Sequence, residues 1–357
     1  MNHNTLKSKT VSAFVPHYRK LGFMMFFVFL MVGYGLSVSY AQEVFRGDEG
    51  AKPYTHLNFQ NNPNNFQFAV ISDRTGGNRP GVFPAAMDIL NLLQPEFVMS
   101  VGDFIEGYVE GEDDNEAVLR SQWAGIDEEI GVLDMPLFFV QGNHDVNFDP
   151  SEKVWFDRVG ASRGYSHFVY KDVLFLMIST EDPPKQEVDD ELKKQYLAIK
   201  AGELTNPKEI MTVIAELEHW AGGTNISETQ VEHVKEALAA NPNVRWTIAF
   251  LHSPPWAQPD PGNFAKIESL LADRPYTIFA GHTHTYNYTR RNGRDYITMG
   301  MTGAGVQQTE SVGNMDHVAW VTMTEEGPII SQILLNGVLD KRGAVPTLQD
   351  SLLYRPR

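Results

Sequence analysis

Six side chains of types that bind divalent metal ions follow short apolar runs in this sequence. Carboxylate, imidazole and amide donors suit Zn, Mn or Fe, and two ions held about 3.5–4 Å apart need one bridging carboxylate with histidine and asparagine around it. Such a centre can activate water for hydrolysis. The candidate ligands are Asp73, Asp103, Asn143, His252, His282 and His284.

Each candidate ligand stands at the carboxyl end of a predicted strand, where α/β sheets carry their functional residues. The predicted strands are residues 66–71, 97–101, 136–140, 244–251 and 276–280. Gly102, Gly142 and Gly281 come directly before three of the ligands. We expect these glycines to let the backbone turn sharply, so that each ligand points into one cleft.

The strands alternate with predicted helices, which favours a layered α/β domain. We predict helices at residues 84–93, 117–132, 150–159 and 228–240, a hairpin over 165–179, and later strands at 295–299, 317–324 and 328–335. Ser227 is the predicted N-cap of the last helix. The charged, mostly helical segment 181–222 carries no candidate ligand, and we interpret it as an insertion: either a solvated helical excursion or a lid.

The N-terminal 41 residues have the pattern of an export signal. They contain four basic and no acidic residues, an apolar run over residues 21–38, and small residues before a predicted cleavage site after Ala41. An uncleaved membrane anchor is the alternative, since about 18 apolar residues nearly span a bilayer. We therefore expect a periplasmic or secreted protein, or one anchored through residues 21–38.

Composition narrows the classes of partner and ligand. The chain has 357 residues, of which 42% are hydrophobic, as in ordinary globular proteins. Without the first 41 residues it has 25 basic and 45 acidic residues, a net charge of −20, which argues against a nucleic-acid partner. It has no cysteine, which excludes thiolate ligands and disulfides.

The motifs, taken in order, resemble the calcineurin-like metallophosphoesterases. That family has Asp-x-His, Gly-Asp-x-x-Asp/Glu, Gly-Asn-His-Asp/Glu, a later single His, and Gly-His-x-His. The corresponding stretches are Asp73-Arg74-Thr75, Gly102-Asp103-Phe104-Ile105-Glu106, Gly142-Asn143-His144-Asp145, His252 and Gly281-His282-Thr283-His284. The match spans residues 66–288 with four of five motifs intact, and it implies a four-layered α/β/β/α sandwich of two mixed sheets.

The resemblance also implies roles for single residues. Asp103 would bridge two metal ions; Asn143, His252 and His282 would complete one site, and Asp73 and His284 would serve the other. His144 would act near the leaving-group oxygen as a general acid or charge stabiliser, while a metal-bridging hydroxide attacks phosphorus in line. The catalytic candidates are His144, Glu106, Asp145 and Arg74.

The first motif departs from the family pattern because Thr75 stands where the family has histidine. This metal site either binds more weakly or recruits another group. Glu106 can orient His144, bind the metal directly, or do neither. Arg74 can be a surface residue or can stabilise charge on a substrate phosphate. The segment Thr75-Gly76-Gly77 is interpreted as a tight turn rather than a phosphate-binding loop.

We therefore predict an exported metal-dependent phosphoesterase acting on a small phosphomonoester or phosphodiester, with two divalent or mixed-valence ions. The alternative is a degenerate family member with one metal ion or none, serving as a binding or scaffold protein. The predicted organisation is an export segment over residues 1–41, a loose lead-in over 42–64, the catalytic domain over 65–340 with the insertion at 181–222, and a peripheral tail over 341–357.

Overall fold

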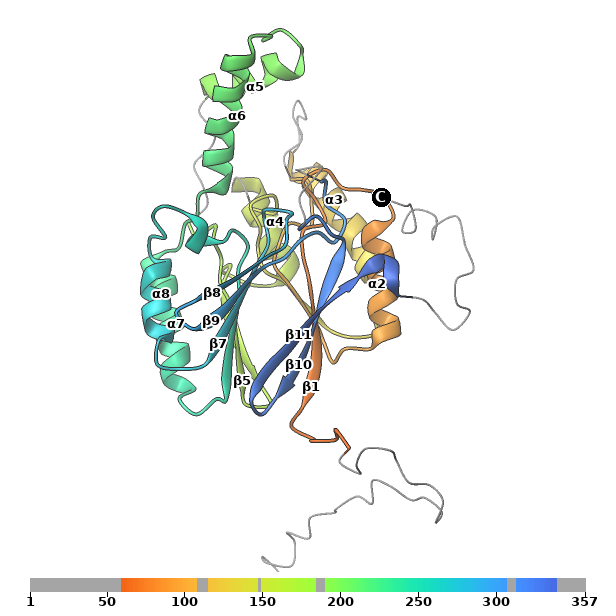
Figure 1. The fold of residues 1–357 in the computed structure, drawn as a ribbon. Helices are drawn as coiled ribbons and strands as arrows, with labels where there is room; N and C mark the ends of the chain where they lie inside the picture. Colours follow the sequence, from red (N-terminus) through yellow and green to blue (C-terminus); the bar gives the residue numbers. More distant parts are fainter. Residues whose placement is uncertain (1–58, 108–114, 147–148, 184–189, 307–312, 339–357) are drawn as a thin grey trace, which may run out of the picture. The chain divides into compact units, whose positions relative to one another are not determined.

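The computed structural model describes residues 59–107, 115–146, 149–183, 190–306 and 313–338 (Figure 1). Every element described below belongs to one compact unit, Asn62–Arg357. The expected export segment, most of the lead-in and the tail lie outside the described residues. Within the part of the chain that is described, no helix has both the length and the apolar character needed to cross a membrane.

One sheet has five strands in the order β11-β10-β1-β2-β3. The strands are β1 (Phe66–Ile71), β2 (Val98–Ser100), β3 (Leu137–Phe138), β10 (His317–Thr324) and β11 (Gly327–Leu334). β1, β2 and β3 run parallel, whereas β10 and β11 are antiparallel to their neighbours. The sheet is therefore mixed.

The other sheet has six strands in the order β4-β5-β6-β7-β9-β8. They are β4 (Ser166–Tyr170), β5 (Val173–Met177), β6 (Trp246–Phe250), β7 (Tyr276–Ala280), β8 (Asn287–Arg291) and β9 (Arg294–Thr298). β5, β6, β7 and β9 are parallel, and the two edge strands β4 and β8 are antiparallel to their neighbours. This sheet is mixed as well.

Helices cover the outer face of each sheet (Figure 1). The helices are α2 (Val82–Leu93), α3 (Asn115–Ile130), α4 (Asp149–Val159), α5 (Asp190–Lys200), α6 (Pro207–Gly222), α7 (Glu228–Ala240) and α8 (Phe264–Leu271), with short 3-10 turns η1 (Pro255–Ala257) and η2 (Leu335–Gly337). α7 begins as predicted, because the Ser227 hydroxyl accepts a hydrogen bond from the N–H of Gln230.

Alternating side chains on the central strands build the layers. In β1, Phe68 faces the opposite sheet, while Ala69 packs against the helices outside. In β5, Phe175 faces inward and Leu174 packs against α7 and α8. This alternation is what the two-residue period of a strand requires when both faces are buried. The four-layered α/β/β/α sandwich expected from the resemblance is confirmed.

The parallel strands place the site. β1, β2 and β3 end at one edge of their sheet, and β6 and β7 end at the corresponding edge of the other, so the loops that follow these strands meet. Three of these strands, β2, β3 and β6, are shorter than predicted, and β3 covers only Leu137–Phe138 of the expected 136–140.

The sequence prediction missed one strand, β8, and one helix, α8, and left one segment undivided. β8 was missed because four of its five side chains are exposed, so it shows no apolar alternation. The segment 181–222 contains two helices, α5 and α6, which rise beyond the sheets in Figure 1 (green). Its base is closed by backbone hydrogen bonds of Asn225 to Thr180 (2.7 Å) and Asp182 (2.9 Å).

Candidate metal centre

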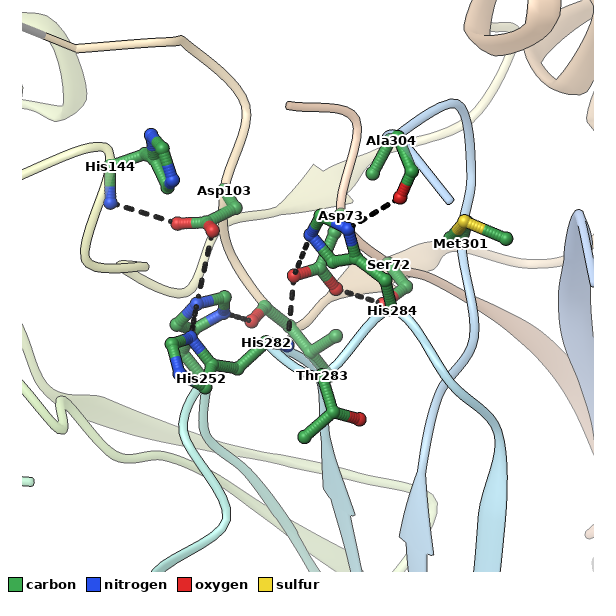
Figure 2. A network of polar contacts seen from close by, with 12 residues as sticks. Ser72, Asp73, Asp103, His144, His252, His282, Thr283, His284, Met301 and Ala304 are labelled. Carbon is green, nitrogen blue, oxygen red and sulfur yellow. Dashed lines mark hydrogen bonds and ion pairs between the residues drawn. The ribbon is translucent and has the colours of Figure 1, made fainter. Parts of the chain in front are cut away.

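Asp103 lies at the centre of the candidate site (Figure 2). It follows β2, and only 1% of its surface is exposed. Its carboxylate belongs to two groups of potential metal ligands, and within each group the donor atoms lie within 4.8 Å of one another. The groups are Asp103 with His252 and His282, and Asp103 with Asp73 and His284. A carboxylate shared in this way is in the position of a bridging ligand.

The first group also includes the side-chain oxygen of Asn143. This Oδ1 lies 3.0 Å from Nε2 of His252 and 2.9 Å from Nδ1 of His282. The two imidazole nitrogens are 3.3 Å apart, and His252 Nε2 is 3.2 Å from Asp103 Oδ2. Two nitrogens bound to one tetrahedral ion at about 2.0–2.1 Å are roughly 3.3 Å apart. These four donors therefore fit a single ion.

The second group has fewer donors. Nε2 of His284 lies 3.6 Å from Oδ1 of Asp73, and both side chains are almost completely buried. The Asp73 carboxylate accepts hydrogen bonds from the N–H of His282 (2.8 Å) and from the hydroxyl of Ser72. These bonds fix the direction of the carboxylate without occupying the imidazole of His284.

Backbone carbonyls determine which imidazole nitrogen faces the centre. Nδ1 of His252 donates to the carbonyl of Val101, and Nδ1 of His284 donates to the carbonyl of Gly305, both at 2.8 Å. Each bond directs Nε2 toward the carboxylates. Metal-bound histidines are commonly held in this way, with one ring nitrogen bound to a carbonyl and the other facing the metal. The side chains present therefore fit a pair of divalent cations.

Three of these ligands have a strained backbone. Asp103, His282 and His284 have φ values of 63°, 73° and 51°, in the left-handed region that side chains with a Cβ disfavour. Such residues cost about 1–3 kcal/mol each and occur mainly at functional sites. Most of the other non-glycine residues with positive φ lie in turns or at a helix end, so the strain within the strand-end loops is concentrated at the candidate ligands.

The glycines next to the ligands act in two different ways. Gly102 has a φ of 98° and makes the sharp turn that was expected. Gly142 has no positive φ; a Cβ there would lie 2.1 Å from Oδ1 of Asp103. At Gly281 a Cβ would lie 2.5 Å from Oδ2 of Asp73. At Gly142 and Gly281 glycine is therefore needed because there is no room for a side chain, not because the backbone turns sharply.

Electrostatics at the centre are dominated by the carboxylate of Asp103. Burial opposes a charge on His252, but Asp103 outweighs burial and raises the pKa of His252 to about 10. Burial also favours the neutral form of Asp103, yet His252 and His144 hold its pKa well below the usual value. Without metal, the imidazole proton balances the carboxylate, and a dication would replace that proton.

His144 is placed to transfer a proton. Its backbone N–H donates to Oδ1 of Asp103 at 3.0 Å, and its ring nitrogen Nδ1 donates to the backbone carbonyl of Glu106 at 3.0 Å. Burial lowers the pKa of His144, but Asp103 and the Glu106 carbonyl outweigh it, so the pKa is raised. Because Nδ1 is bound to the Glu106 carbonyl, the second ring nitrogen, Nε2, is the one that can donate to a leaving oxygen.

The carboxylate of Glu106 binds backbone N–H groups of the loop that follows Thr75. It accepts hydrogen bonds from the N–H groups of Asn78 (2.9 Å) and Gly77 (3.3 Å). Burial raises the pKa of Glu106, but the Thr75 hydroxyl and these two N–H groups outweigh it, so the pKa is lowered. The hydrogen bond that orients the His144 ring comes from the backbone carbonyl of Glu106.

Arg74 and Asp145, two catalytic candidates from the sequence, have other partners in the structure. The Arg74 guanidinium donates twice to Glu129 of α3, at 2.6 and 2.9 Å, and once to the carbonyl of Phe104 at 3.1 Å. These bonds hold Arg74 toward α3 rather than toward a substrate.

The carboxylate of Asp145 is completely buried and accepts backbone N–H groups. The donors of Asp103, Phe104 and Gly142 each lie at 2.9 Å. Burial and the neighbouring Asp103 charge raise the pKa of Asp145 to about 7. Asp145 therefore positions the loop that carries Asp103, and its side chain is not exposed to a substrate.

Sequence reasoning overlooked the residues that hold the ligands in place. Ser72 bonds Asp73, and the N–H of Ser72 bonds the hydroxyl of Thr302 at 3.0 Å. Gly305 orients His284. The only signal in the sequence was a glycine-rich stretch, Gly303-Ala304-Gly305, which begins four residues after the end of the predicted strand 295–299.

Residues 66–286 match the family described as calcineurin-like phosphoesterase. The chain belongs to this family. Among solved structures, this phosphoesterase is similar to PhoD, with 10% identity, 75% of this chain and 68% of that chain covered, and a TM-score of 0.51. At such low identity the similarity supports the fold alone.

Two further solved structures are similar to this phosphoesterase. A dimetal phosphatase from Danio rerio has 15% identity, with 76% of this chain and 99% of that chain covered and a TM-score of 0.49. The purple acid phosphatase PPD1 from yellow lupin (Lupinus luteus) has 13% identity, with 76% and 52% covered and a TM-score of 0.45. Comparison with curated proteins finds no match.

Proposed function

We propose that this phosphoesterase is an exported hydrolase that binds two divalent cations and cleaves small phosphomonoesters or phosphodiesters. The observation that supports the proposal is the shared carboxylate of Asp103, which belongs to both groups of potential ligands. A carboxylate packed only for stability has no need of three surrounding imidazoles, whereas a bridging ligand does.

Each residue has a defined part in this proposal. Asp103, Asn143, His252 and His282 hold one cation, and Asp73, Asp103 and His284 hold the other. When bound, the two cations polarise the phosphoryl oxygens and activate water. Asp145 and Ser72 hold the carboxylates of the centre in place through the hydrogen bonds described above.

His144 supplies the proton in this proposal. Its Nδ1 is committed to the carbonyl of Glu106, so Nε2 is the nitrogen that donates to the leaving oxygen. Proton donation by a positioned side chain contributes about 10²–10⁴-fold to rate. His144→Asn keeps the backbone N–H that binds Asp103 and removes the donor, so we expect metal binding to persist while turnover of esters with poor leaving groups falls most.

The proposed site of action is outside the cytoplasm. The N-terminal residues 1–41 carry the export pattern, and the remaining net charge of −20 disfavours nucleic acid as a substrate. Fractionation of cells that produce the full chain tests this, with a variant carrying Asp in place of Leu30 and Met31 as control. A chain that stays in the cytoplasm would contradict the export proposal.

An assay of hydrolysis together with metal content tests the enzymatic proposal. We expect purified protein with two equivalents of Zn, Mn or Fe to hydrolyse an aryl phosphate or a bis-aryl phosphodiester. We expect Asp103→Ala to lower kcat/KM by at least about 10³-fold, because both cations lose a ligand. If wild type and Asp103→Ala are equally inactive, the scaffold alternative based on Thr75 is favoured instead.

A further inference from the structure

The two halves of the candidate metal centre differ in their number of protein donors. Asp103, Asn143, His252 and His282 converge on one position with four donors. The other position has Asp73, Asp103 and His284. Because Asp103 is shared, the difference lies in the remaining ligands, of which the first position has three and the second has two.

Thr75 does not make up the difference. It lies two residues after Asp73 and is completely buried, and its hydroxyl oxygen has no hydrogen-bond partner of ordinary geometry within the described part of the chain. The hydroxyl lies close enough to the carboxylate of Glu106 to lower the pKa of that carboxyl. A neutral hydroxyl is a poor ligand for Zn, Mn or Fe, so Thr75 leaves the second position without an imidazole or a carboxylate.

Glu106 does not make up the difference either. Its carboxylate is held by the N–H groups of Gly77 and Asn78 on the loop that follows Thr75. In the described part of the chain its carboxylate belongs to neither group of potential ligands. The carboxylate therefore binds this loop rather than completing the second position.

The backbone at Gly76 closes the space beside His284. A Cβ at Gly76 would lie 2.6 Å from Cε1 of His284 and 3.8 Å from Nε2 of His144. The loop thus approaches the second position with bare main chain, where no side-chain donor can be accommodated. The shortage of ligands is built into the loop 75–78 and is not repaired by a neighbour.

We infer that the two cation sites bind with unequal affinity: an ion at Asp103, Asn143, His252 and His282 is retained, and an ion at Asp73, Asp103 and His284 exchanges. The inference rests on the proposed two-metal function and concerns its regulation by free metal. Loss of one supporting ligand contact typically lowers metal affinity by about 10–100-fold, so we expect the second ion to bind at least about tenfold more weakly than the first.

Native mass spectrometry of the metal-free full chain, titrated with chelator-buffered Zn²⁺, measures both steps. We expect a one-zinc species over at least about a tenfold range of free Zn²⁺ before the two-zinc species forms. Asp73→Asn assigns the sites: it should abolish the weaker ion and retain the tighter one. His282→Gln should weaken the tighter ion.

Variants of the loop distinguish the causes. Thr75→Asp introduces a carboxylate of similar size, and we expect it to narrow the gap between the two affinities. Thr75→Val is the matched control and should leave the gap unchanged, as should Glu106→Gln. Circular dichroism establishes that each variant is folded. If Thr75→Asp does not fold, the wild-type titration and the Asp73→Asn assignment still decide the question.

Three results would overturn the inference. Two zinc ions that bind wild type together with equal affinity would show that the sites are equivalent, and the hydrolase proposal would stand. A loss of about tenfold or more for the second ion in Glu106→Gln would make Glu106 its missing ligand. If no zinc binds at all, both the inference and the proposed two-metal function fail.

Discussion

At the scale of single residues, the centre depends on contacts that only a few residue types allow. Asp103 has a left-handed backbone, and its carboxylate lies so close to Gly142 that any side chain there would collide with it. The buried carboxylate of Asp145 holds the same loop by accepting hydrogen bonds from the backbone N–H groups of Asp103 and Phe104. These contacts exchange local stability for precise placement of one carboxylate.

Replacing Gly142 by alanine tests this placement. The new Cβ would lie 2.1 Å from Oδ1 and 2.4 Å from the backbone nitrogen of Asp103, so the loop must move. We expect a loss of about 1–3 kcal/mol in the free energy of unfolding from overpacking, and loss of bound zinc. Urea unfolding and elemental analysis measure the two effects.

Gly125→Ala is the matched control for this substitution. Gly125 lies on the exposed face of α3, and a Cβ there meets nothing within 4 Å. Alanine should stabilise the helix by about 1 kcal/mol and leave the zinc content unchanged. If Gly142→Ala were as harmless as Gly125→Ala, the close approach of Gly142 to Asp103 would have no importance for the centre.

His317 gives the fold a dependence on pH that is separate from the metal centre. It is buried in β10; its Nε2 accepts the N–H of Gly300 and its Nδ1 donates to Gln332, both at 2.8 Å. Both bonds require the neutral ring, and burial outweighs Gln332 and Asp316 to lower the pKa of His317 to about 4.

The sign of the effect follows from where protons bind. The unfolded chain takes up a proton near the ordinary pKa of about 6.5, before the folded chain does. The contribution of His317 to stability is therefore complete above pH 6.5 and is lost as the pH falls from about 6.5 to about 4, by about 3 kcal/mol in all. Urea unfolding at pH 7.5 and 4.5 measures this loss. His317→Gln should lose markedly less, and an equally steep loss in that variant would exclude His317 as the cause.

The role of a residue is hardest to predict from sequence where both its side chain and its backbone can form hydrogen bonds. The six ligand candidates could be identified because each follows an apolar run that ends abruptly. The role of Glu106 could not, because the same residue offers a carboxylate and a carbonyl, and only the fold shows that His144 binds the carbonyl. Asp145 was equally ambiguous, because its burial beneath the loop is a property of packing.

At the scale of elements, strands with a buried face were predictable and exposed ones were not. β1 and β7 begin and end at the predicted residues, because nearly all of their side chains are buried and residues that favour turns or loops flank them. β8 has few buried side chains and takes its position from hydrogen bonds to β9. The residues of an exposed strand such as β8 do not show by themselves which strand it pairs with.

The pair α5 and α6 lies outside the three hydrophobic clusters formed by the described residues. The chain leaves the second sheet after β5 and returns at Asn225, whose side chain donates to the carbonyl of Pro183 at 3.0 Å. The two ends of the segment are thus already adjacent at its base.

We therefore predict that residues 184–223 can be replaced by a linker of about three Gly and Ser residues. The free energy of unfolding should change by less than about 1 kcal/mol, because no residue of these clusters is removed. Zinc content and hydrolysis of a small aryl phosphate should be retained. If the excised protein lost its zinc or failed to fold, α5 and α6 would be part of the centre rather than an appendage beside it.

At the scale of the whole molecule, the centre joins the carboxyl edges of two different sheets. Asp73, Asp103 and Asn143 follow strands of the five-stranded sheet, and the histidine ligands follow β6 and β7 of the other. The family resemblance gave this architecture in advance, whereas strand alternation alone supported only layered α/β. Thr75 in the first motif already indicated an unequal number of donors on the two sides of Asp103. What the pattern left open is whether Glu106 repairs the shortage, and within the described residues Glu106 belongs to neither group of potential ligands.

The central claim is that Asp103 lies between two cations at the junction of the sheets. Anomalous X-ray scattering from crystals grown with excess Zn²⁺ tests it most directly. We predict two peaks about 3.5–4 Å apart, one on each side of the Asp103 carboxylate, with the peak near His252 and His282 the more fully occupied. A single peak, or peaks beyond bonding distance of Asp103, would contradict the account.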